Sequence, residues 1–402
     1  MSDVGSVAQL PVLRLKRNED RRLHAGHAWV FSNEVDTQQT PLTRFQPGEL
    51  ARLLSHNDKA MGLAYVNPKS LICARLLNTW TIPDTGWLAA RMRHALALRE
   101  RLYQAPFYRL VYGESDGLPG LVVDRYGKIA VVQIGTAGME RLKAQIQEAL
   151  PKVFDCTAVL FKNDSAAREL EGLPCYVEEG FGKLPERVSV LEDALKFEAP
   201  LGGGQKTGWF FDQAANRRNL VKYVTRGARV LDVFSYVGAW GVRALAAGAG
   251  EVVCVDSSAA ALEAAQRNAA ANGGKIRDLK GDAFEALETL ARQKEKFDVV
   301  ILDPPAFAKR KKELPKALSA YKKLNQLAMQ LMGEGVLVSC SCSYHLSAED
   351  LQDSIAKAAR GAEKQLQILE TGMQAWDHPV HPAIPETRYL KAYFCRVSES
   401  LK

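Results

Sequence analysis

Short continuous apolar runs alternate with helical segments in the C-terminal half of the chain, over residues 186–402. Such runs are typical of parallel strands that are buried on both faces. The predicted strands are 229–234, 251–256, 278–282, 297–303 and 335–339, and helices are predicted at 213–223 and 259–272. This alternation predicts a doubly wound α/β domain, which binds ligands at the carboxyl ends of its strands.

Shorter segments separated by turn signals fill the first half of the chain. Three short strands at 50–54, 60–66 and 71–76 predict a small β-barrel domain over residues 1–80. Residues 81–185 predict a helix, a hairpin, a second helix and a strand, at 87–104, 121–134, 138–150 and 158–162. We expect the arginines of the first helix to lie on the face opposite its apolar residues. The result is a small α+β domain that links the other two and carries no catalytic residue.

Length, charge and cysteine content limit the number of domains, the kind of partner and the cellular compartment. The 402 residues are enough for two or three domains, and the formal net charge of +7 favours a polyanionic partner, although many enzymes with small substrates are equally basic. Seven cysteines without a Cys-x-x-Cys pair indicate free thiols in a reducing cytoplasm and no metal site. We expect neither a signal peptide nor a membrane span, because no apolar run approaches the necessary length.

Basic and aromatic side chains occur together near the N-terminus. Residues 13–17 alternate apolar with basic side chains, and Trp29 follows. This combination suits RNA, whose phosphates take the charge and whose unpaired bases stack on aromatic rings. The alternative is a solvated basic strand above a core tryptophan.

The segment 229–241 resembles the start of a nucleotide-binding domain. An apolar run leads through the turn residues Phe234, Tyr236 and Gly238 into an Ala-rich helix. A glycine in such a turn lets a ligand approach the backbone. The spacing is not Gly-x-Gly-x-x-Gly, so no pyrophosphate loop is expected. A nucleoside cofactor without phosphates fits better, and S-adenosyl-L-methionine is the obvious one.

Three aspartates fall at or near the ends of successive predicted strands. We assign Asp256 to the ribose hydroxyls, Asp282 to the adenine amino group and Asp232 to the methionine end of the cofactor. The alternative is that all three are helix N-caps. A glycine-dense loop, 202–213, adds the candidate cofactor residues Lys206, Thr207, Asp212 and Gln213.

A rigid loop follows the fourth predicted strand. In Asp303-Pro304-Pro305-Ala306-Phe307, the two prolines stiffen the backbone. Asp303 could accept hydrogen bonds from the edge of a base, and Phe307 could stack on it. The cationic run that follows could contact phosphates or be a solvated loop; its residues are Lys309, Arg310, Lys311 and Lys312.

Cys340 and Cys342 close the fifth predicted strand. Alternation puts both on one face, with Cys342 further toward the ligand edge. Cytosine C5 accepts a methyl group only after a nucleophile adds to C6, and a thiolate can do this. We therefore interpret Cys342 as a nucleophile working beside Asp303. A buried core thiol is the alternative.

The whole chain resembles the bacterial large-subunit ribosomal RNA cytosine-C5 methyltransferases that begin with a PUA domain. The likeness rests on several segments together: residues 15–31, Gly113-Glu-Ser-Asp-Gly-Leu-Pro-Gly120, residues 206–213, residues 231–238, residues 303–307 and Ser341-Cys-Ser343. It implies a PUA-like RNA-binding domain, a linking domain and a Rossmann-like class I S-adenosylmethionine-dependent methyltransferase domain over 186–402. The implied partner is 23S ribosomal RNA.

The resemblance also implies residue roles. Cys342 is the nucleophile, Asp303 holds the cytosine, and Asp232, Asp256 and Asp282 line the cofactor site. Related enzymes carry a second cysteine after Pro-Pro, where this chain has Ala306. The general base is unassigned.

Two other functions stay open. Asp-Pro-Pro-aromatic also resembles enzymes that methylate a guanine or an exocyclic amine, and these need no thiol. The third alternative is an RNA-binding protein with a degenerate methyltransferase domain. The sequence also leaves open whether the chain forms a homodimer.

Overall fold

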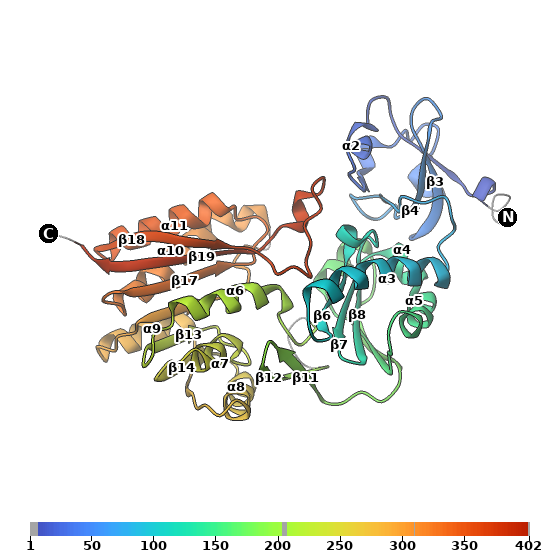
Figure 1. The fold of residues 1–402 in the computed structure, drawn as a ribbon. Coiled ribbons are helices and arrows are strands. Elements are labelled where there is room, and N and C mark those ends of the chain that lie inside the picture. The colour runs from blue at the N-terminus through green and yellow to red at the C-terminus, as the bar shows by residue number, and fades with distance from the viewer. Residues whose placement is uncertain (1–6, 203–206, 309, 401–402) are drawn as a thin grey trace. The chain divides into compact units, whose positions relative to one another are not determined.

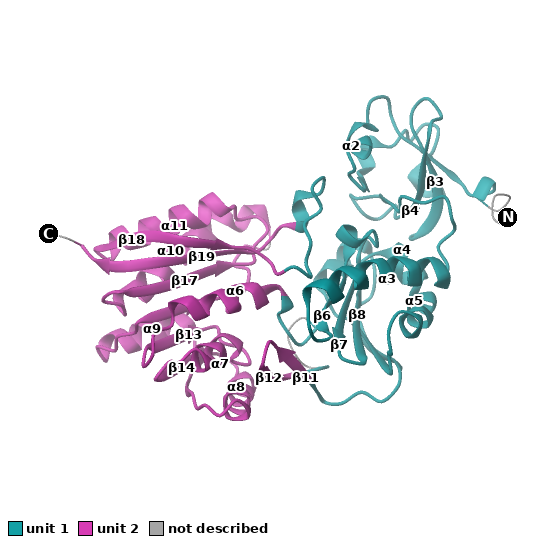
Figure 2. Ribbon diagram, viewed as in Figure 1, with its two compact units in different colours: residues 1–188, 200–211, 376–387 teal, residues 189–199, 212–375, 388–402 magenta. Residues whose placement is uncertain are grey.

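A computed structural model describes residues 7–202, 207–308 and 310–400. The chain divides into two compact units, each built from several segments (Figures 1 and 2). Unit 1 contains residues 1–188, 200–211 and 376–387, and unit 2 contains residues 189–199, 212–375 and 388–402. The predicted domain boundaries at 80 and 185 stay predictions. Within the described ranges, no helix is long and apolar enough to cross a membrane.

Unit 2 is organised by a seven-stranded sheet with the order β15-β14-β13-β16-β17-β19-β18. Strands β15 to β17 of that order are parallel, and β19 pairs antiparallel with both β17 and β18. The strands are β13 (Arg229–Val233), β14 (Glu251–Asp256), β15 (Arg277–Lys280), β16 (Val299–Leu302), β17 (Gly335–Ser341), β18 (Lys364–Gly372) and β19 (Lys391–Glu399). The predicted doubly wound α/β architecture is confirmed, and the two antiparallel strands at its edge are additional.

One of the helices described in unit 2 precedes β13, and the others connect successive strands from β13 to β18. In chain order, the helices are α6 (Ala214–Leu220), α7 (Ala239–Ala246), α8 (Ala259–Ala271), α9 (Ala283–Arg292), α10 (Leu314–Gln330) and α11 (Ala348–Gly361). One hydrophobic core joins the strands to α9, α10 and α11. Helices α7 and α8 pack on each other and on β14. Right-handed crossovers put these two groups on opposite faces, because the strand order reverses between β15 and β16.

Unit 1 contains two five-stranded sheets, ordered β1-β3-β4-β5-β2 and β10-β9-β8-β7-β6. The first consists of β1 (Val12–Arg14), β2 (Trp29–Val30), β3 (Glu49–Leu54), β4 (Ala60–Val66) and β5 (Ala74–Leu76). The second consists of β6 (Phe107–Tyr112), β7 (Leu121–Tyr126), β8 (Ile129–Ile134), β9 (Ala158–Asn163) and β10 (Tyr176–Phe181). Helices α3 (Thr85–Leu102), α4 (Ala137–Arg141) and α5 (Lys143–Ala149) contribute to the core of this second sheet. A two-stranded ribbon, β11 (Arg187–Glu192) and β12 (Leu195–Pro200), follows in the chain, and its residues 189–199 belong to unit 2.

Buried ion pairs fasten the elements of unit 1. Arg99 of α3 is fully buried, and its guanidinium donates to both carboxylate oxygens of Asp116 at 2.7 Å. The expectation that the arginines of this helix lie on the face opposite its apolar residues is therefore wrong for Arg99. The carboxylate of Asp116, 17 residues later in the sequence, pairs with the guanidinium and so offsets the cost of burying its charge. Arg109 pairs in the same way with Asp124, which is also buried.

A late segment of the chain, residues 376–387, completes unit 1. Its buried Asp377 accepts a hydrogen bond from the Arg109 backbone N–H at 2.8 Å, through Oδ2. The carbonyl oxygen of Asp377 accepts from Arg99 Nη2, also at 2.8 Å. Residues separated by more than 250 positions in sequence thus share one hydrogen-bond network.

Candidate active site

The turn between β13 and α7 has an unusual backbone. Phe234, Tyr236 and Gly238 all have positive φ angles, at 65°, 48° and 78°. Left-handed backbone is uncommon outside glycine and is typical of sites where the surrounding structure holds strain. At Gly238 a Cβ would lie 2.7 Å from the Cβ of Ala265, so a side chain there would collide with α8.

Asp256 at the end of β14 holds this turn in place. Its Oδ2 accepts from the Tyr236 N–H and its Oδ1 from the Ser258 N–H, both at 2.9 Å. The side chain is partly exposed, so its carboxylate can accept further hydrogen bonds from hydroxyl groups. Asp282 is exposed and caps α9 by accepting from the N–H groups of Phe284 and Glu285. The alternative that the three aspartates are helix N-caps is therefore correct for the geometry of Asp282.

Asp232 lies in β13 and is completely buried. Its Oδ2 accepts from the Gly241 N–H at 2.9 Å, in the first turn of α7. Burial, together with the nearby charges of Asp303 and Asp256, raises the pKa of Asp232 to about 7. Among the described residues, Asp232 Oδ1 has no hydrogen-bond partner. The Asp232 side chain thus stabilises the start of α7 by this hydrogen bond. Its role toward the cofactor stays a prediction.

Asp303 is fixed at the end of β16 by two side chains. Gln213 Nε2 donates to Oδ1 at 2.8 Å, and Trp240 Nε1 donates to Oδ2 at 3.0 Å. Asn216 holds Gln213 in turn, donating to its Oε1 at 2.7 Å. The three elements that supply these groups lie far apart in sequence. Their convergence orients the carboxylate before any ligand arrives.

Cys342 follows β17 directly and is partly exposed. Its Sγ lies 3.9 Å from the carbonyl oxygen of Pro304, so the thiol borders the loop that begins with Asp303. Both flanking serines are buried: Ser341 Oγ accepts from the Tyr321 hydroxyl at 2.9 Å, and Ser343 Oγ donates to a backbone carbonyl at 2.6 Å. Cys340 is fully buried, and burial raises the pKa of its thiol well above the usual value.

Lys391 is a further charged residue near Cys342. It opens β19 and pairs with Ser341 across the sheet. Its Nζ donates to the carbonyl oxygens of Ser343 and Leu346, at 2.6 Å each. Burial lowers the pKa of Lys391 to about 8, while a charge on Cys342 would raise it. Neither Lys391 nor Trp240 is a sequence-predicted site residue.

Aromatic rings connect the loop after β16 to the turn after β13. The Phe307 ring lies 4.8 Å from that of Tyr321 and 6.4 Å from that of Phe234, measured between centroids. Pro304 is buried and Pro305 is exposed. Candidate residues from the ends of β13, β16 and β17 therefore come together.

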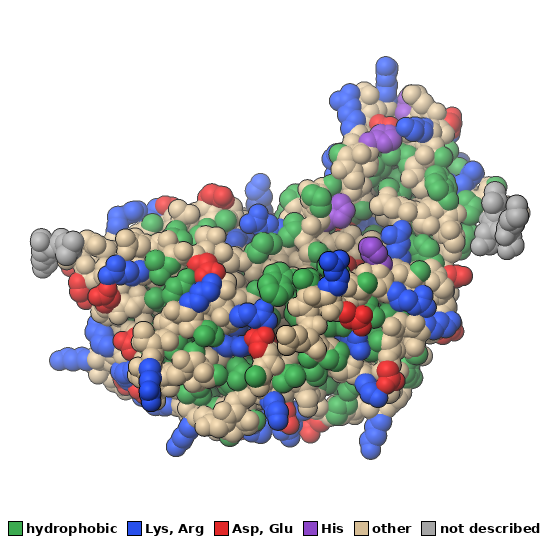
Figure 3. Space-filling view, in the orientation of Figure 1, with side chains coloured by type: hydrophobic (Ala, Val, Ile, Leu, Met, Phe, Trp, Pro, Cys, Tyr) green, Lys and Arg blue, Asp and Glu red, His purple; other side chains and the backbone are tan. Residues whose placement is uncertain are grey.

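The cationic candidate residues that the structure describes lie on the surface. Arg310, Lys311 and Lys312 are exposed, while Lys206 and Lys309 lie outside the described residues. On the face drawn in Figure 3, Lys and Arg side chains are dispersed among Asp and Glu rather than gathered in one patch.

Two further candidates from the glycine-dense loop belong to different units. Thr207 is in unit 1, where its buried hydroxyl donates to Asp124. Asp212 is in unit 2 and accepts from the Tyr389 hydroxyl. The structure thus gives Thr207 a bonding partner within unit 1, and its cofactor role stays a prediction.

The arrangement fits a nucleoside cofactor that carries no phosphate. Carboxylates follow neighbouring parallel strands, and they would repel a pyrophosphate. They can instead accept hydrogen bonds from hydroxyl and amino groups. Asp256, partly exposed at the end of β14, is the residue best placed to hold a ribose diol.

Matches to domain families define the class of protein. The S-adenosylmethionine-dependent methyltransferase family matches residues 163–393, more than half of the chain, and a PUA-like domain family matches residues 13–79. These matches and the fold define a methyltransferase whose cofactor is S-adenosylmethionine, which confirms the cofactor and fold-class predictions.

Curated relatives extend over nearly the whole chain. Ribosomal RNA large subunit methyltransferase I of Klebsiella pneumoniae subsp. pneumoniae is 36% identical over 400 residues, covering 96% of this chain and 98% of the relative. The protein of the same name from Escherichia coli is 35% identical over 398 residues, covering 96% and 99%. The chain belongs to this family of ribosomal RNA large subunit methyltransferases.

Solved structures share the fold over a similar length. A candidate S-adenosylmethionine-dependent methyltransferase from Streptococcus mutans superimposes with a TM-score of 0.80 at 19% identity, covering 96% of this chain and 100% of the other. A second candidate methyltransferase, solved with S-adenosylhomocysteine, gives a TM-score of 0.82 with the same identity and coverage. At this identity the likeness supports the fold alone.

Proposed function

We propose that this protein methylates C5 of a cytosine in 23S ribosomal RNA through a covalent bond between Cys342 and cytosine C6. The observation that carries the proposal is the position of the thiol. Cys342 Sγ lies 3.9 Å from the Pro304 carbonyl oxygen, beside a carboxylate that Gln213 and Trp240 hold in one orientation. The names of the curated relatives support ribosomal RNA of the large subunit as the substrate.

The chemistry assigns one step to the thiol. The Cys342 thiolate adds to C6, and the electron pair of the C5–C6 double bond moves to C5. S-adenosylmethionine, when bound, would supply the methyl group to C5, and its sulfonium would leave as the thioether S-adenosylhomocysteine. A base then removes the proton from C5, the double bond re-forms, and the bond between sulfur and C6 breaks to release the thiolate. The base that takes this proton is unassigned.

Neighbouring side chains have separate tasks in this proposal. The Asp303 carboxylate accepts a hydrogen bond from the exocyclic amine of the cytosine. Phe307 offers a ring face beside the base. The Lys391 ammonium, half-buried near Cys342, favours the thiolate over the thiol by its positive charge.

The decisive experiment compares two cysteine variants on a ribosomal RNA substrate. Cys342→Ala removes the nucleophile, so we expect methyl transfer to fall at least about 10³-fold while S-adenosylmethionine still binds. Cys395→Ala is the matched control, because it removes a fully buried thiol of the same unit, in β19, and is expected to keep methylation. Mass spectrometry of the RNA identifies the methylated nucleotide.

A trapping experiment tests the covalent bond itself. Fluorine at C5 of the target cytosine blocks loss of a proton from C5, so the adduct with wild-type protein should persist under denaturing electrophoresis. Cys342→Ala should give no such band. If Cys342→Ala methylates RNA at the normal rate, the proposal is wrong, and a guanine or amine acceptor becomes the better one.

A further inference from the structure

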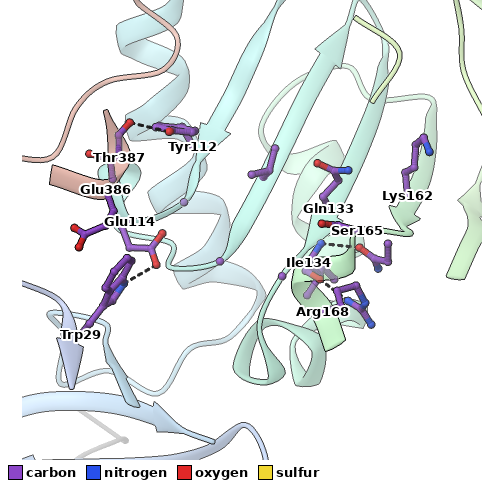
Figure 4. A pocket seen from close by; sticks show the side chains of 15 residues that line it. Trp29, Tyr112, Glu114, Gln133, Ile134, Lys162, Ser165, Arg168, Glu386 and Thr387 are labelled. Carbon is purple, nitrogen blue, oxygen red and sulfur yellow. Dashed lines mark hydrogen bonds between the residues drawn. The ribbon is translucent and has the colours of Figure 1, made fainter. Parts of the chain in front are cut away.

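A cavity of about 290 Å³ lies within unit 1, and none of the candidate active-site residues lines it. Four separate parts of the unit line it. They are Trp29 of β2, the connection between β6 and β7, the ends of β8 and β9 with the segment that follows β9, and the late segment at Glu386 and Thr387 (Figure 4). The first part of that connection is the Gly113-Glu-Ser-Asp-Gly motif, to which sequence analysis assigned no chemistry.

One side of the cavity carries aromatic and acidic groups. Trp29 Nε1 donates to Glu114 Oε1 at 2.8 Å, and the Tyr112 hydroxyl donates to the Thr387 carbonyl oxygen at 2.8 Å. Glu386 lies beside them in Figure 4. Among the described residues, the buried Oε2 of Glu386 has no hydrogen-bond partner. This side therefore presents an aromatic surface and an acceptor with unused capacity.

The opposite side carries buried hydrogen-bond donors. Lys162, Asn163 and Arg168 line it and are each at least 97% buried. Lys162 Nζ pairs with Asp164, and Arg168 donates through Nε to the Pro174 carbonyl oxygen and through Nη1 to Glu140. Within the described part of the chain, Arg168 Nη2 has no acceptor. Buried donors without acceptors are rare in folded proteins, and a ligand that supplies acceptors would satisfy them.

We propose that this cavity binds a single unpaired nucleotide of the RNA substrate, with a base that carries an amino group. The base lies against Trp29, its amino group donates to Glu386, and its phosphate faces Lys162 and Arg168. The volume is near the lower end of the range for small-molecule sites, about 300–1,000 Å³, which suits one nucleotide rather than a helix. The inference rests on the proposed function, because that function supplies the RNA.

The chemistry of the base follows from the acceptors. A carboxylate recognises an exocyclic amine, which adenine, guanine and cytosine possess and uracil lacks. Stacking on an aromatic ring is available to every base, so it contributes affinity without selecting among them. The cavity should therefore discriminate against uridine.

Nuclear magnetic resonance of the full-length protein can test this directly. The indole N–H of Trp29, assigned by its loss in Trp29→Phe, reports on the cavity. We titrate AMP, GMP, CMP and UMP in turn, without S-adenosylmethionine. The expected result is a saturable shift of this resonance, with at least one amine-bearing nucleotide binding fivefold or more tightly than UMP.

Three variants assign the effect to the cavity. Glu386→Gln keeps the side-chain shape and should weaken the preferred nucleotide at least fivefold, while Glu169→Gln, on an exposed residue of the same unit, should leave it unchanged. Val122→Trp, which places a large ring on the cavity lining, should abolish binding at an unchanged melting temperature.

The titration is repeated in Cys342→Ala, so that the cavity and the methyl transfer are judged separately. Nucleotide binding that persists in a protein without the covalent chemistry supports the cavity even if the proposed function fails. Absence of a saturable shift with all four nucleotides, equal affinity for UMP, or identical binding by Glu386→Gln and Glu169→Gln overturns the inference.

Discussion

The two units hold their carboxylates in different ways. In unit 1, Asp116 and Asp124 each receive two hydrogen bonds from a buried guanidinium. In unit 2, Asp256 at the end of β14 is held by backbone N–H groups, and Asp303 at the end of β16 accepts from the neutral side chains of Gln213 and Trp240. Both kinds of carboxylate are well ordered by their donors.

We propose that this difference separates structural acids from those that bind a ligand. A guanidinium cancels the charge of its partner and keeps it there, so the pair fastens two elements together. Neutral donors fix the direction of a carboxylate without cancelling its charge, which leaves it able to interact with a ligand. Aspartates that look alike in the sequence can thus be sorted by the groups that donate to them.

The largest effect should come from breaking a pair in unit 1. Asp116→Asn leaves the Arg99 charge fully buried beside an amide, and we expect the free energy of unfolding to fall by about 3–5 kcal/mol. Urea denaturation measures this loss. Asp155→Asn, which breaks an exposed pair with Lys128, is the control and should cost less than about 1 kcal/mol. If Asp116→Asn lowered the free energy of unfolding by a similarly small amount, the pair would not be structural, and the comparison between the two units would fail.

The next effect should come from Asp303 and should fall on catalysis. Asp303→Asn presents an amide N–H where the base amine needs an acceptor, and we expect kcat to fall about 10²-fold with S-adenosylmethionine still bound. Single-turnover kinetics and calorimetry measure the two quantities. Asp278→Asn, on an exposed position of the edge strand β15, should keep full activity. A loss of stability with normal kcat would make Asp303 a structural acid instead.

The smallest effect concerns Lys391 and depends on pH. Because its pKa is about 8, Lys391 is charged below pH 8 and favours the Cys342 thiolate there. Lys391→Met removes this charge, so the rate at pH 7 should fall about tenfold, and the difference from wild type should fade above pH 8. Lys391→Arg should restore much of the rate, and Lys364→Met, at the start of β18, should have no effect. Parallel pH–rate profiles for wild type and Lys391→Met would contradict this role.

Local patterns predict most of the fold of unit 2 but only part of the site. Continuous apolar runs locate β13, β14, β16 and β17 within a few residues, because burial on both faces leaves a direct mark on composition. Cys342 and Asp303 can be proposed as site residues from the sequence, because a thiol and a carboxylate at the ends of strands suggest their own chemistry. Lys391 and Trp240 are not, because their positions depend on which strands pair and which helix turns toward β16.

In unit 1, too, the sequence does not reveal contacts between residues that lie far apart in the chain. The periodicity of α3 predicts its apolar face correctly but cannot reveal that Arg99 is buried, since the partner Asp116 lies in a later loop. Nothing in residues 376–387 indicates locally that they belong to unit 1. The unused hydrogen-bonding groups around Trp29 likewise become visible only when four distant segments are brought together.

The place of Asp377 in the network of unit 1 has a consequence for how the chain is made. While the first 375 residues emerge from the translation machinery, Arg99 and the backbone of Arg109 lack two of their acceptors. Unit 1 therefore cannot reach its final bonding pattern during early synthesis, although most of it is translated first. A chain cut short before Asp377 would lack both acceptors, so the N-terminal half depends for its final hydrogen bonds on a segment that is made late.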